Sequence, residues 1–282
     1  MDRHLRAIDH VLVAVRELEE AAERWRALGF TLTPPGRHPQ WGTANRCIMF
    51  EDGYIELLAF SGEGPRNRPE LERFLATRGE GIFGLALASD DAQATAEAWR
   101  SLGFSASGPH PLARRLDRDG GVELRFVNVL LPSEELEGLL IFACQHLTPE
   151  LLRRSEWLRH ANGARRLGSI TLHAEPTDAV VSVLERLFGT ATESRTDNVT
   201  GFHFDGASVL VMPDEDVQLL HPVSEIREGG CAPHFVALSV MVERLEDTRA
   251  ALASRRIAVR EIPHALAVAP AAASGVVLEF TT

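Results

Sequence analysis

A repeated helix ending constrains the fold of this chain more than any other feature of its sequence. The segment WRALGF at residues 25–30 recurs as WRSLGF at residues 99–104. Each copy closes an amphipathic stretch that follows an apolar run, at residues 8–15 in the first copy and 81–89 in the second. Self-similarity of this kind is the signature of a fold built from one repeated supersecondary unit. We therefore expect the chain to be an array of similar modules.

The first copy defines the module as a strand, a helix and three further strands. Residues 8–15 predict the first strand, residues 17–28 the helix, and residues 31–33, 46–51 and 54–60 the remaining strands. Gly29 follows the helix as a stop signal, and the pair Asp52-Gly53 marks a turn between the last two strands. The helix is indicated by apolar residues at helical spacing: Leu18, Ala21, Ala22, Trp25 and Leu28.

Two further modules complete the chain. The third is predicted from a strand at residues 169–174, a helix at 176–188 and a last strand at 206–211. The fourth has a strand at 234–240 and a helix at 242–255, and the last strand of the second module is expected at 138–142. Leu28, Leu102 and Leu187 should then be equivalent buried positions at the ends of their helices.

The modules should pair, because each leaves one face of its sheet without cover. Two sheets that pair in this way form a half-open barrel with a concave interior. The longest connections are residues 61–80 and 146–167, and the second is expected to separate a domain at residues 1–150 from one at 165–282. The expected fold class is therefore α+β, with tandem βαβββ modules in two half-open barrels.

Composition excludes several classes of function. The chain has no lysine among its 29 basic residues, which excludes Schiff-base chemistry and a phosphate-loop lysine. A net charge of −11 argues against nucleic-acid binding. No apolar run is long enough to span a membrane, and no signal peptide is evident, so we expect a cytoplasmic protein. Its three cysteines, Cys47, Cys144 and Cys231, are far apart in sequence and are expected to be reduced thiols.

The first strand carries His10, and the run YIELL at residues 54–58 carries Glu56. With these two residues, the βαβββ modules resemble those of the vicinal oxygen chelate superfamily, which includes glyoxalases, extradiol dioxygenases and drug-resistance proteins. The loop GRHPQWGTANR at residues 36–46 further resembles the glyoxalase-like subgroup. The resemblance implies substrate-binding roles for His38, Trp41, Thr43 and Asn45. The alternative is a turn whose polar groups satisfy their own backbone.

In this superfamily, metal ligands come from the first and last strands of two paired modules. The resemblance implies His10, Glu56, His234 and Glu279 as ligands of a divalent metal (Zn, Ni, Co or Fe), with Glu56 or Glu279 as the catalytic base. The middle modules lack such residues, and Gly84 stands at the position of His10 in the second. Pairing of the first module with the last would bring all four to one centre, whereas pairing of neighbours would leave two ligands in each pocket.

The sequence leaves the function open among three alternatives. The first is a glyoxalase-like isomerase or lyase that uses a metal to hold two vicinal oxygens of a small substrate. A set of two His and one Glu would instead favour an iron-dependent dioxygenase. The third alternative is a non-catalytic protein that sequesters an apolar small molecule. The pairs Arg114-Arg115 and Arg165-Arg166 are read as solvated charge, and the oligomeric state stays open, a homodimer included.

Overall fold

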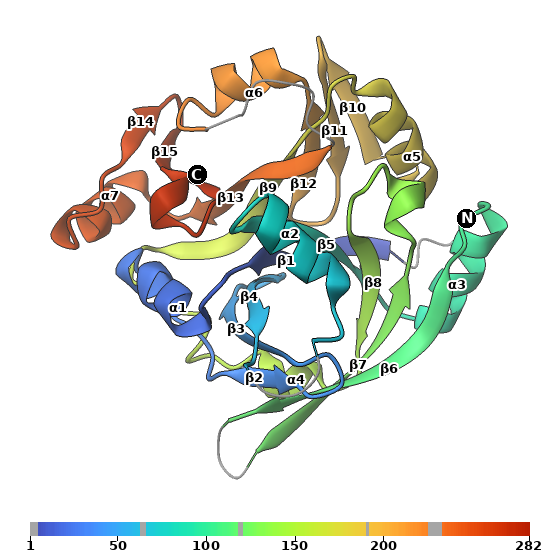
Figure 1. Ribbon diagram of the computed structural model, residues 1–282. Helices are drawn as coiled ribbons and strands as arrows, with labels where there is room; N and C mark the ends of the chain where they lie inside the picture. The colour runs from blue at the N-terminus through green and yellow to red at the C-terminus, as the bar shows by residue number, and fades with distance from the viewer. Residues whose placement is uncertain (1–4, 63–65, 118–120, 190–191, 225–232) are drawn as a thin grey trace.

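The computed structural model describes residues 5–62, 66–117, 121–189, 192–224 and 233–282, so Cys231 lies outside the described residues. The fold is α+β, and the order of one strand, one helix and three strands occurs four times along the chain (Figure 1). Within the described part of the chain, none of the helices has the length and hydrophobicity that a membrane crossing requires.

The first two modules form a closed barrel. Its strands run in the order β1-β4-β3-β2-β6-β7-β8-β5, closed by antiparallel pairing of β1 with β5 and of β2 with β6. Helices α1 and α3 lie on opposite outer sides of the barrel (Figure 1). The elements are β1 (Leu5–Ala14), α1 (Leu18–Ala27), β2 (Gly36–His38), β3 (Thr43–Met49), β4 (Tyr54–Phe60), α2 (Pro69–Thr77), β5 (Gly81–Ser89), α3 (Ala92–Ser101), β6 (Ser107–Leu116), β7 (Val122–Leu130) and β8 (Ile141–His146).

The last two modules form one eight-stranded sheet in the order β10-β11-β12-β9-β13-β16-β15-β14. Its central strands β9 and β13 are antiparallel, as β1 and β5 are in the barrel. Neighbouring modules therefore pair in both halves. The elements are α4 (Pro149–Leu152), β9 (Ala164–His173), α5 (Asp178–Phe188), β10 (Glu193–Thr196), β11 (Val199–His203), β12 (Ser208–Met212), α6 (Asp214–Leu220), β13 (His234–Val242), α7 (Leu245–Ser254), β14 (Arg260–Ile262), β15 (Ala265–Val268) and β16 (Val277–Thr281).

Three segments differ from the sequence prediction. Residues 31–33 are not a strand, because Pro34 and Pro35 follow them and have no N–H for a ladder, so pairing begins with β2 at Gly36. The connection at residues 61–80 contains α2, which starts at Pro69 and buries Leu71 and Leu75. The last strand of the second module is β8, at Ile141–His146, rather than residues 138–142. A 3-10 turn (Ser133–Leu136) and a left-handed Gly138 precede it.

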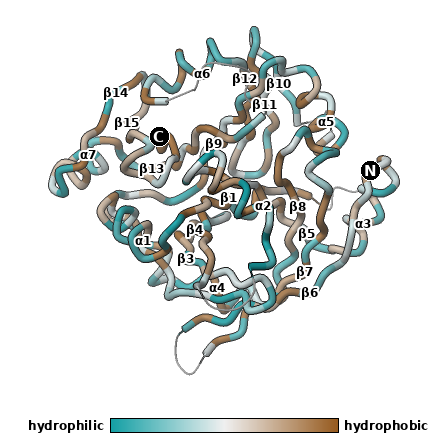
Figure 2. Tube along the Cα trace, in the orientation of Figure 1, coloured by the Kyte–Doolittle hydropathy of each residue, from teal (hydrophilic) through white to brown (hydrophobic). Residues whose placement is uncertain are grey.

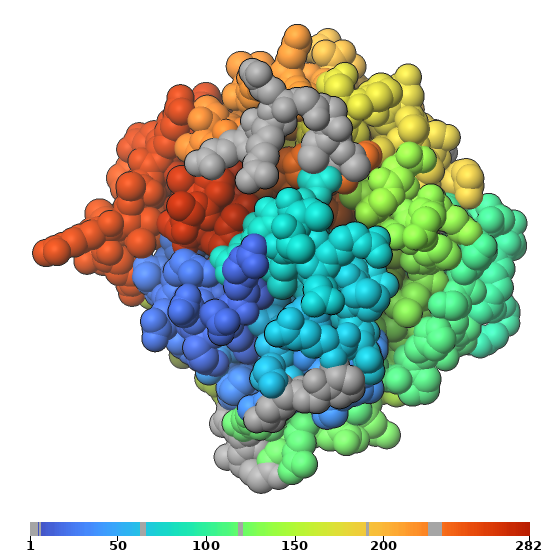
Figure 3. Space-filling view, viewed as in Figure 1, coloured from blue at the N-terminus to red at the C-terminus, as the bar shows by residue number. Residues whose placement is uncertain are grey.

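An apolar layer between the two sheets is the main core of the molecule. Alternate residues of the central strands contribute to it, and its members include Val11, Val13, Leu85, Leu167, Ile170, Leu238 and Val240. The opposite residues of β1, such as Leu12 and Ala14, face a second apolar cluster inside the barrel. Apolar stretches accordingly gather along the strands at the centre of the molecule (Figure 2), and the two halves pack together along one side of the barrel (Figure 3).

The leucines at the helix ends of the repeat are buried largely as predicted. Leu28 and Leu187 are buried, whereas Leu102 is only partly buried against the same core. Gly29 has φ of +89°, and a Cβ there would lie 3.0 Å from Cβ of Asn162. Asn162 in turn donates from Nδ2 to the carbonyl oxygen of Leu28 at 2.9 Å. The connection between the halves is thus hydrogen-bonded to the end of α1 through Asn162.

Candidate functional site

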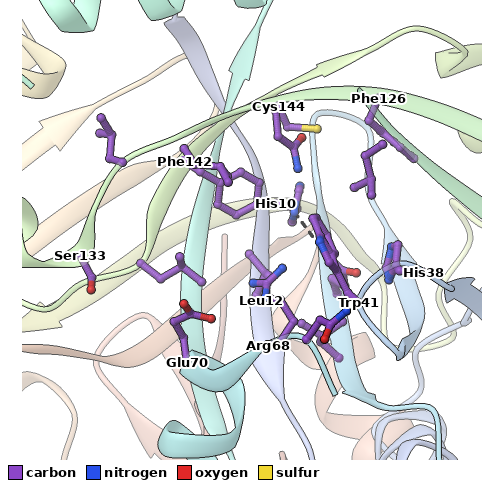
Figure 4. Close-up of a pocket in the computed structure, with 18 of the residues that line it drawn as sticks. His10, Leu12, His38, Trp41, Arg68, Glu70, Phe126, Ser133, Phe142 and Cys144 are labelled. Carbon is purple, nitrogen blue, oxygen red and sulfur yellow. Dashed lines mark ion pairs between the residues drawn. The ribbon is translucent and has the colours of Figure 1, made fainter. Parts of the chain in front are cut away.

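A pocket of about 390 Å³ lies inside the first barrel. Its polar lining includes His10, His38, Glu56 and Arg114, and its apolar lining includes residues of β1, β4, β7 and β8. In Figure 4, Phe126 and Cys144 lie at the top of the view, Arg68 and Glu70 lie at the bottom, and His10 lies between these two pairs. The start of α2 therefore contributes to the pocket, although the sequence was read there as a plain connection.

Asp9 and His10 are both buried because the pairing of β1 with β5 shifts register between Ile8 and His10. Nδ1 of His10 lies 2.6 Å from Oδ2 of Asp9, and Nε2 of His146 lies 2.9 Å from the same oxygen. Burial alone would raise the pKa of Asp9, but the two imidazoles hold it well below its usual value. Asp9 is therefore an ionised carboxylate that fixes the ring of His10.

Glu56 faces His10 across the pocket. Its Oε2 lies 3.4 Å from Nε2 of His10, and its Oε1 accepts a hydrogen bond from Nδ2 of Asn45. Burial opposes ionisation, but His10, His38 and Arg114, together with the bond from Asn45, lower the pKa of Glu56 below its ordinary value. The result is a buried, ionised carboxylate with one oxygen held by an amide and the other directed at an imidazole.

The loop that suggested substrate binding lies at this pocket. His38 is buried, and its Nδ1 lies 3.1 Å from Oγ1 of Thr43, while its ring packs on Trp41 with centroids 5.7 Å apart. Burial, with smaller contributions from Arg114 and Arg68, lowers the pKa of His38 to about 4. His38 is thus neutral at physiological pH. Thr43 is buried and contacts His38, but it is not among the described residues that line the pocket.

Arg114 is the largest departure from the sequence interpretation, which read it as solvated charge. Its side chain lies on β6 inside the barrel and is 2 % exposed. Nη1 donates to Sγ of Cys47 at 3.0 Å, whereas Nε and Nη2 have no hydrogen-bond partner among the described residues. Burial would lower the pKa of Arg114, but Cys47, Tyr54 and Glu56 raise it, so the guanidinium is charged. No signal in the sequence distinguishes Arg114 from its exposed neighbour Arg115.

In the second sheet, Glu279 has a different partner from the one expected. Its Oε1 lies 2.8 Å from Nδ1 of His221, whose Nε2 lies 2.9 Å from Oγ1 of Thr171, and all three residues are buried. His221 directly follows α6 and closes this network. His234 instead lies at the start of β13 against the ring of His173, with centroids 5.1 Å apart.

Strand register explains why His234 does not correspond to His10. Glu56 is in register with Leu12, and Glu279 with Ser239. His10 is two residues before Leu12, so its equivalent two residues before Ser239 is Ala237 and not His234. Similar spacing along the chain therefore concealed a different position in the sheet.

The structure does not bring the four expected metal ligands to one centre. His10 and Glu56 line the pocket inside the barrel. Glu279 belongs to the other sheet, between Leu278 and Phe280, whose side chains both enter the apolar layer that separates the halves. Glu279 consequently points away from the barrel. His10 and Glu56 remain as one pair, as expected for pairing of neighbouring modules.

The barrel pocket does not fit a divalent metal centre. The second module places Gly84 and Phe142 at the positions of His10 and Glu56, so these four positions supply two protein donors where three or four are usual. His38 and Cys144 also line the pocket, but among the described residues neither forms a group of three donors with His10 and Glu56. The buried guanidinium of Arg114 adds a positive charge to the same pocket, and this opposes cation binding. The carboxylate and imidazole are better suited to hydrogen bonding and proton transfer.

Two other groups of three potential donors occur among the described residues: Asp9, Cys144 and His146, and His173, Glu175 and Asp214. In the first group, Asp9 is already engaged by two histidines. Burial also raises the pKa of the Cys144 thiol well above its usual value, so that thiol is neutral. The second group lies at the end of β9, away from the barrel pocket.

Comparison with known proteins identifies the family. Residues 8–188 match the glyoxalase-like domain. The chain belongs to the glyoxalase-like domain family. The match covers the whole barrel with its pocket, and it ends within the third module, before His234 and Glu279. No curated protein matches the chain in sequence.

Solved structures share the fold of this glyoxalase-like protein, which is that of the vicinal oxygen chelate superfamily. A hypothetical protein from Staphylococcus aureus is 12% identical, with a TM-score of 0.67 over 97% of this chain and 98% of its own. A xylose isomerase-like TIM barrel/4-hydroxyphenylpyruvate dioxygenase fusion protein is 15% identical, with a TM-score of 0.56 over 92% of this chain and 40% of its own. Methylmalonyl-CoA epimerase from Mycobacterium tuberculosis is 24% identical, with a TM-score of 0.42 over 55% of this chain and 96% of its own.

Proposed function

We propose that the barrel pocket is the active site of an isomerase or epimerase that moves a proton on a small carbonyl substrate, with Glu56 as the base. The observation that carries this proposal is a buried Glu56 that is kept ionised beside His10 in the pocket inside the barrel. A desolvated carboxylate with a positioned imidazole is suited to general acid–base catalysis.

In the proposed step, Oε2 of Glu56 removes a proton from a carbon next to the substrate carbonyl. The C–H bond breaks, its electron pair forms a C=C bond, the π pair of the carbonyl moves to its oxygen, and an O–H bond forms on Glu56. Return of the proton to the other face of the same carbon completes an epimerisation. For an α-hydroxy carbonyl substrate, transfer of the hydroxyl proton to the enolate oxygen and return of the carbon-bound proton to the former carbonyl carbon complete an isomerisation. Asn45 keeps Oε1 of Glu56 occupied, so only Oε2 is available to the substrate.

His10 is proposed to stabilise the anion that this step forms. Asp9 holds Nδ1, so Nε2 is the ring atom that faces the pocket. An N–H at Nε2 donates toward the enolate oxygen, and the nearby charge of Arg114 adds to the stabilisation. The resemblance to glyoxalases implies a metal in this role, and here His10 and Arg114 are proposed to take it.

Hydrogen–deuterium exchange tests this proposal directly. Small α-hydroxy and α-keto carbonyl compounds are incubated with the protein in D₂O, and loss of their C–H signals is followed by proton NMR. We expect exchange with the unaltered protein and a decrease of about 10²–10⁴-fold in Glu56→Gln, the usual contribution of a general base. The exposed Glu72→Gln, at the surface of α2, serves as the matched control and should keep full exchange.

Binding without exchange would favour the second candidate, a protein that holds a small molecule without converting it. The apolar part of the pocket lining, including Leu12, Leu58, Phe126 and Phe142, supports that alternative. Compounds that bind but exchange no faster than in Glu56→Gln would contradict the enzyme and leave the binding protein.

A further inference from the structure

We propose that the barrel pocket recognises a carboxylate on an otherwise apolar small molecule, and that Arg114 is the residue that binds it. This inference rests on the proposed function for its site and names the class of substrate that enters. Its test measures binding alone, so it can fail or succeed without any turnover.

The first argument is the unmet hydrogen-bonding capacity of Arg114. The side chain is 2 % exposed, and no ion pair of Arg114 is present in the part of the chain that the structure describes. Its one hydrogen bond goes to Sγ of Cys47, whose pKa burial raises to about 11, so the thiol is neutral. A buried guanidinium with two unpaired donors at a pocket can bind a polar group of a ligand.

The second argument is the geometry of the two N–H donors of Arg114 that have no partner. Nε and Nη2 lie on one edge of the guanidinium and present two parallel N–H groups. Two parallel donors of this kind match the two oxygens of a carboxylate in a bidentate pair. The third nitrogen, Nη1, is the one that Cys47 already fixes, and this contact holds the plane of the group. Arg114 therefore lines the pocket with its carboxylate-binding edge buried and unpaired.

The total charge of the pocket does not provide the selectivity. Arg68, Arg73 and Arg114 line it, but so do Glu56, Glu70 and Glu134. Arg68 has its guanidinium 4.6 Å from the centre of the Trp41 ring, at the start of α2. Because the lining charges balance, recognition depends on the two free donors of Arg114 rather than on a general positive field.

The third argument concerns the rest of the ligand. The pocket volume of about 390 Å³ is much larger than a carboxylate group needs. Its other surfaces are largely apolar, with Leu12, Leu58, Phe126 and Phe142 among them. An organic acid with an apolar body satisfies both parts, because the body covers these side chains while the acid pairs with Arg114.

Matched pairs of acids and amides test the inference in the unaltered protein. Calorimetry compares phenylacetate with phenylacetamide, hexanoate with hexanamide and acetate with acetamide at pH 7.5. Each pair has nearly the same shape and differs in charge. We expect phenylacetate or hexanoate to bind at least 10-fold more tightly than its amide. If none of the three acids exceeds its amide by more than 2-fold, the inference is overturned.

Phenyl phosphate separates a carboxylate site from a general anion site. It should bind more weakly than phenylacetate if the planar edge of Arg114 is the determinant. Tighter binding of phenyl phosphate would overturn the assignment to carboxylates.

Variants then assign the preference to residues. Arg114→Lys keeps the charge but loses the two parallel donors, and the ratio of acid to amide affinity should fall below 3-fold. Arg66 is exposed just before α2, and the Arg66→Gln variant should keep the full ratio of acid to amide affinity. Should Arg114→Lys fail to fold, the acid and amide comparison in the unaltered protein still decides.

Glu56→Gln distinguishes this inference from the proposed function. The substitution removes the base and a nearby negative charge, so phenylacetate should bind at least as tightly while proton exchange is lost. A loss of exchange with intact carboxylate binding supports both proposals. Exchange that does not depend on Glu56 overturns only the proposed function, and a missing preference for acids overturns only this inference.

Discussion

At the scale of single residues, the barrel pocket combines side chains that local motifs carry with side chains that only the tertiary structure brings there. His10, Glu56, His38 and Asn45 could be proposed because a strand or loop pattern carries each of them. Asp9 becomes buried only through a register shift in β1, a feature that no local pattern reveals. Arg114 enters the pocket only because β6 closes the barrel against β2. Both are among the most informative residues of the site.

His38 makes a prediction about stability and pH. Its pKa is about 4 in the folded protein and about 6.5 when the chain is unfolded, because burial favours the neutral ring. The unfolded chain therefore binds a proton first as the pH falls, so stability is fully present above pH 6.5 and decreases toward pH 4. This one group should remove about 2 kcal/mol of unfolding free energy between pH 7 and pH 5.

Urea unfolding at the two pH values checks the His38 prediction. The His38→Gln variant should lose about 2 kcal/mol less than the unaltered protein over this interval. The exposed His110→Gln variant should keep the full loss. Equal losses in His38→Gln and the unaltered protein would show that the ring is not held neutral in the folded state.

At the scale of elements, hydrophobic periodicity predicted the repeated strand and helix well, and the errors occur where a local signal acts against the pattern. Two prolines displaced the second strand to Gly36. The connection at residues 61–80 was not predicted to contain α2, although Pro69 stands in its first turn, where proline is favourable. In the second module, a 3-10 turn moved the last strand toward the carboxyl terminus.

The leucines at the helix ends of the repeat should differ in how much they contribute to stability. Leu28→Ala and Leu187→Ala should each lower the free energy of unfolding by about 2–5 kcal/mol, because both side chains are buried. Leu102→Ala should cost less, because its side chain is already partly exposed before truncation. Denaturation of the three variants in urea measures this order. A cost for Leu102→Ala equal to that for Leu28→Ala would contradict the burial that distinguishes them.

At the scale of the whole molecule, the pairing of modules could not be predicted from the sequence. The similar spacing of His10 with Glu56 and of His234 with Glu279 indicated two equivalent pairs of ligands and left both pairings of modules open, because spacing along a chain does not specify strand register. The register assigns Ala237, not His234, to the equivalent position. The second sheet then has a buried network of Thr171, His221 and Glu279 where the barrel has an open pocket.

The shared apolar layer leads to a prediction about cooperativity. All four tryptophans, Trp25, Trp41, Trp99 and Trp157, lie in the first half of the chain or in the connection that follows it. Tryptophan fluorescence therefore reports on the barrel, whereas far-ultraviolet circular dichroism reports on both halves. Because β13 packs against β5 through this layer, we expect the two signals to change together in urea, as one cooperative transition.

A substitution in the second sheet makes this prediction sharper. Leu238 is fully buried in the shared layer, and Leu238→Ala should lower the free energy of unfolding by about 2–5 kcal/mol. If the halves unfold as one unit, this change must move the fluorescence midpoint of the barrel as far as the dichroism midpoint. Leu219→Ala, at a side chain that is 75% exposed on α6, should move neither. A dichroism shift with unchanged fluorescence would mean that the barrel folds independently of the sheet that covers it.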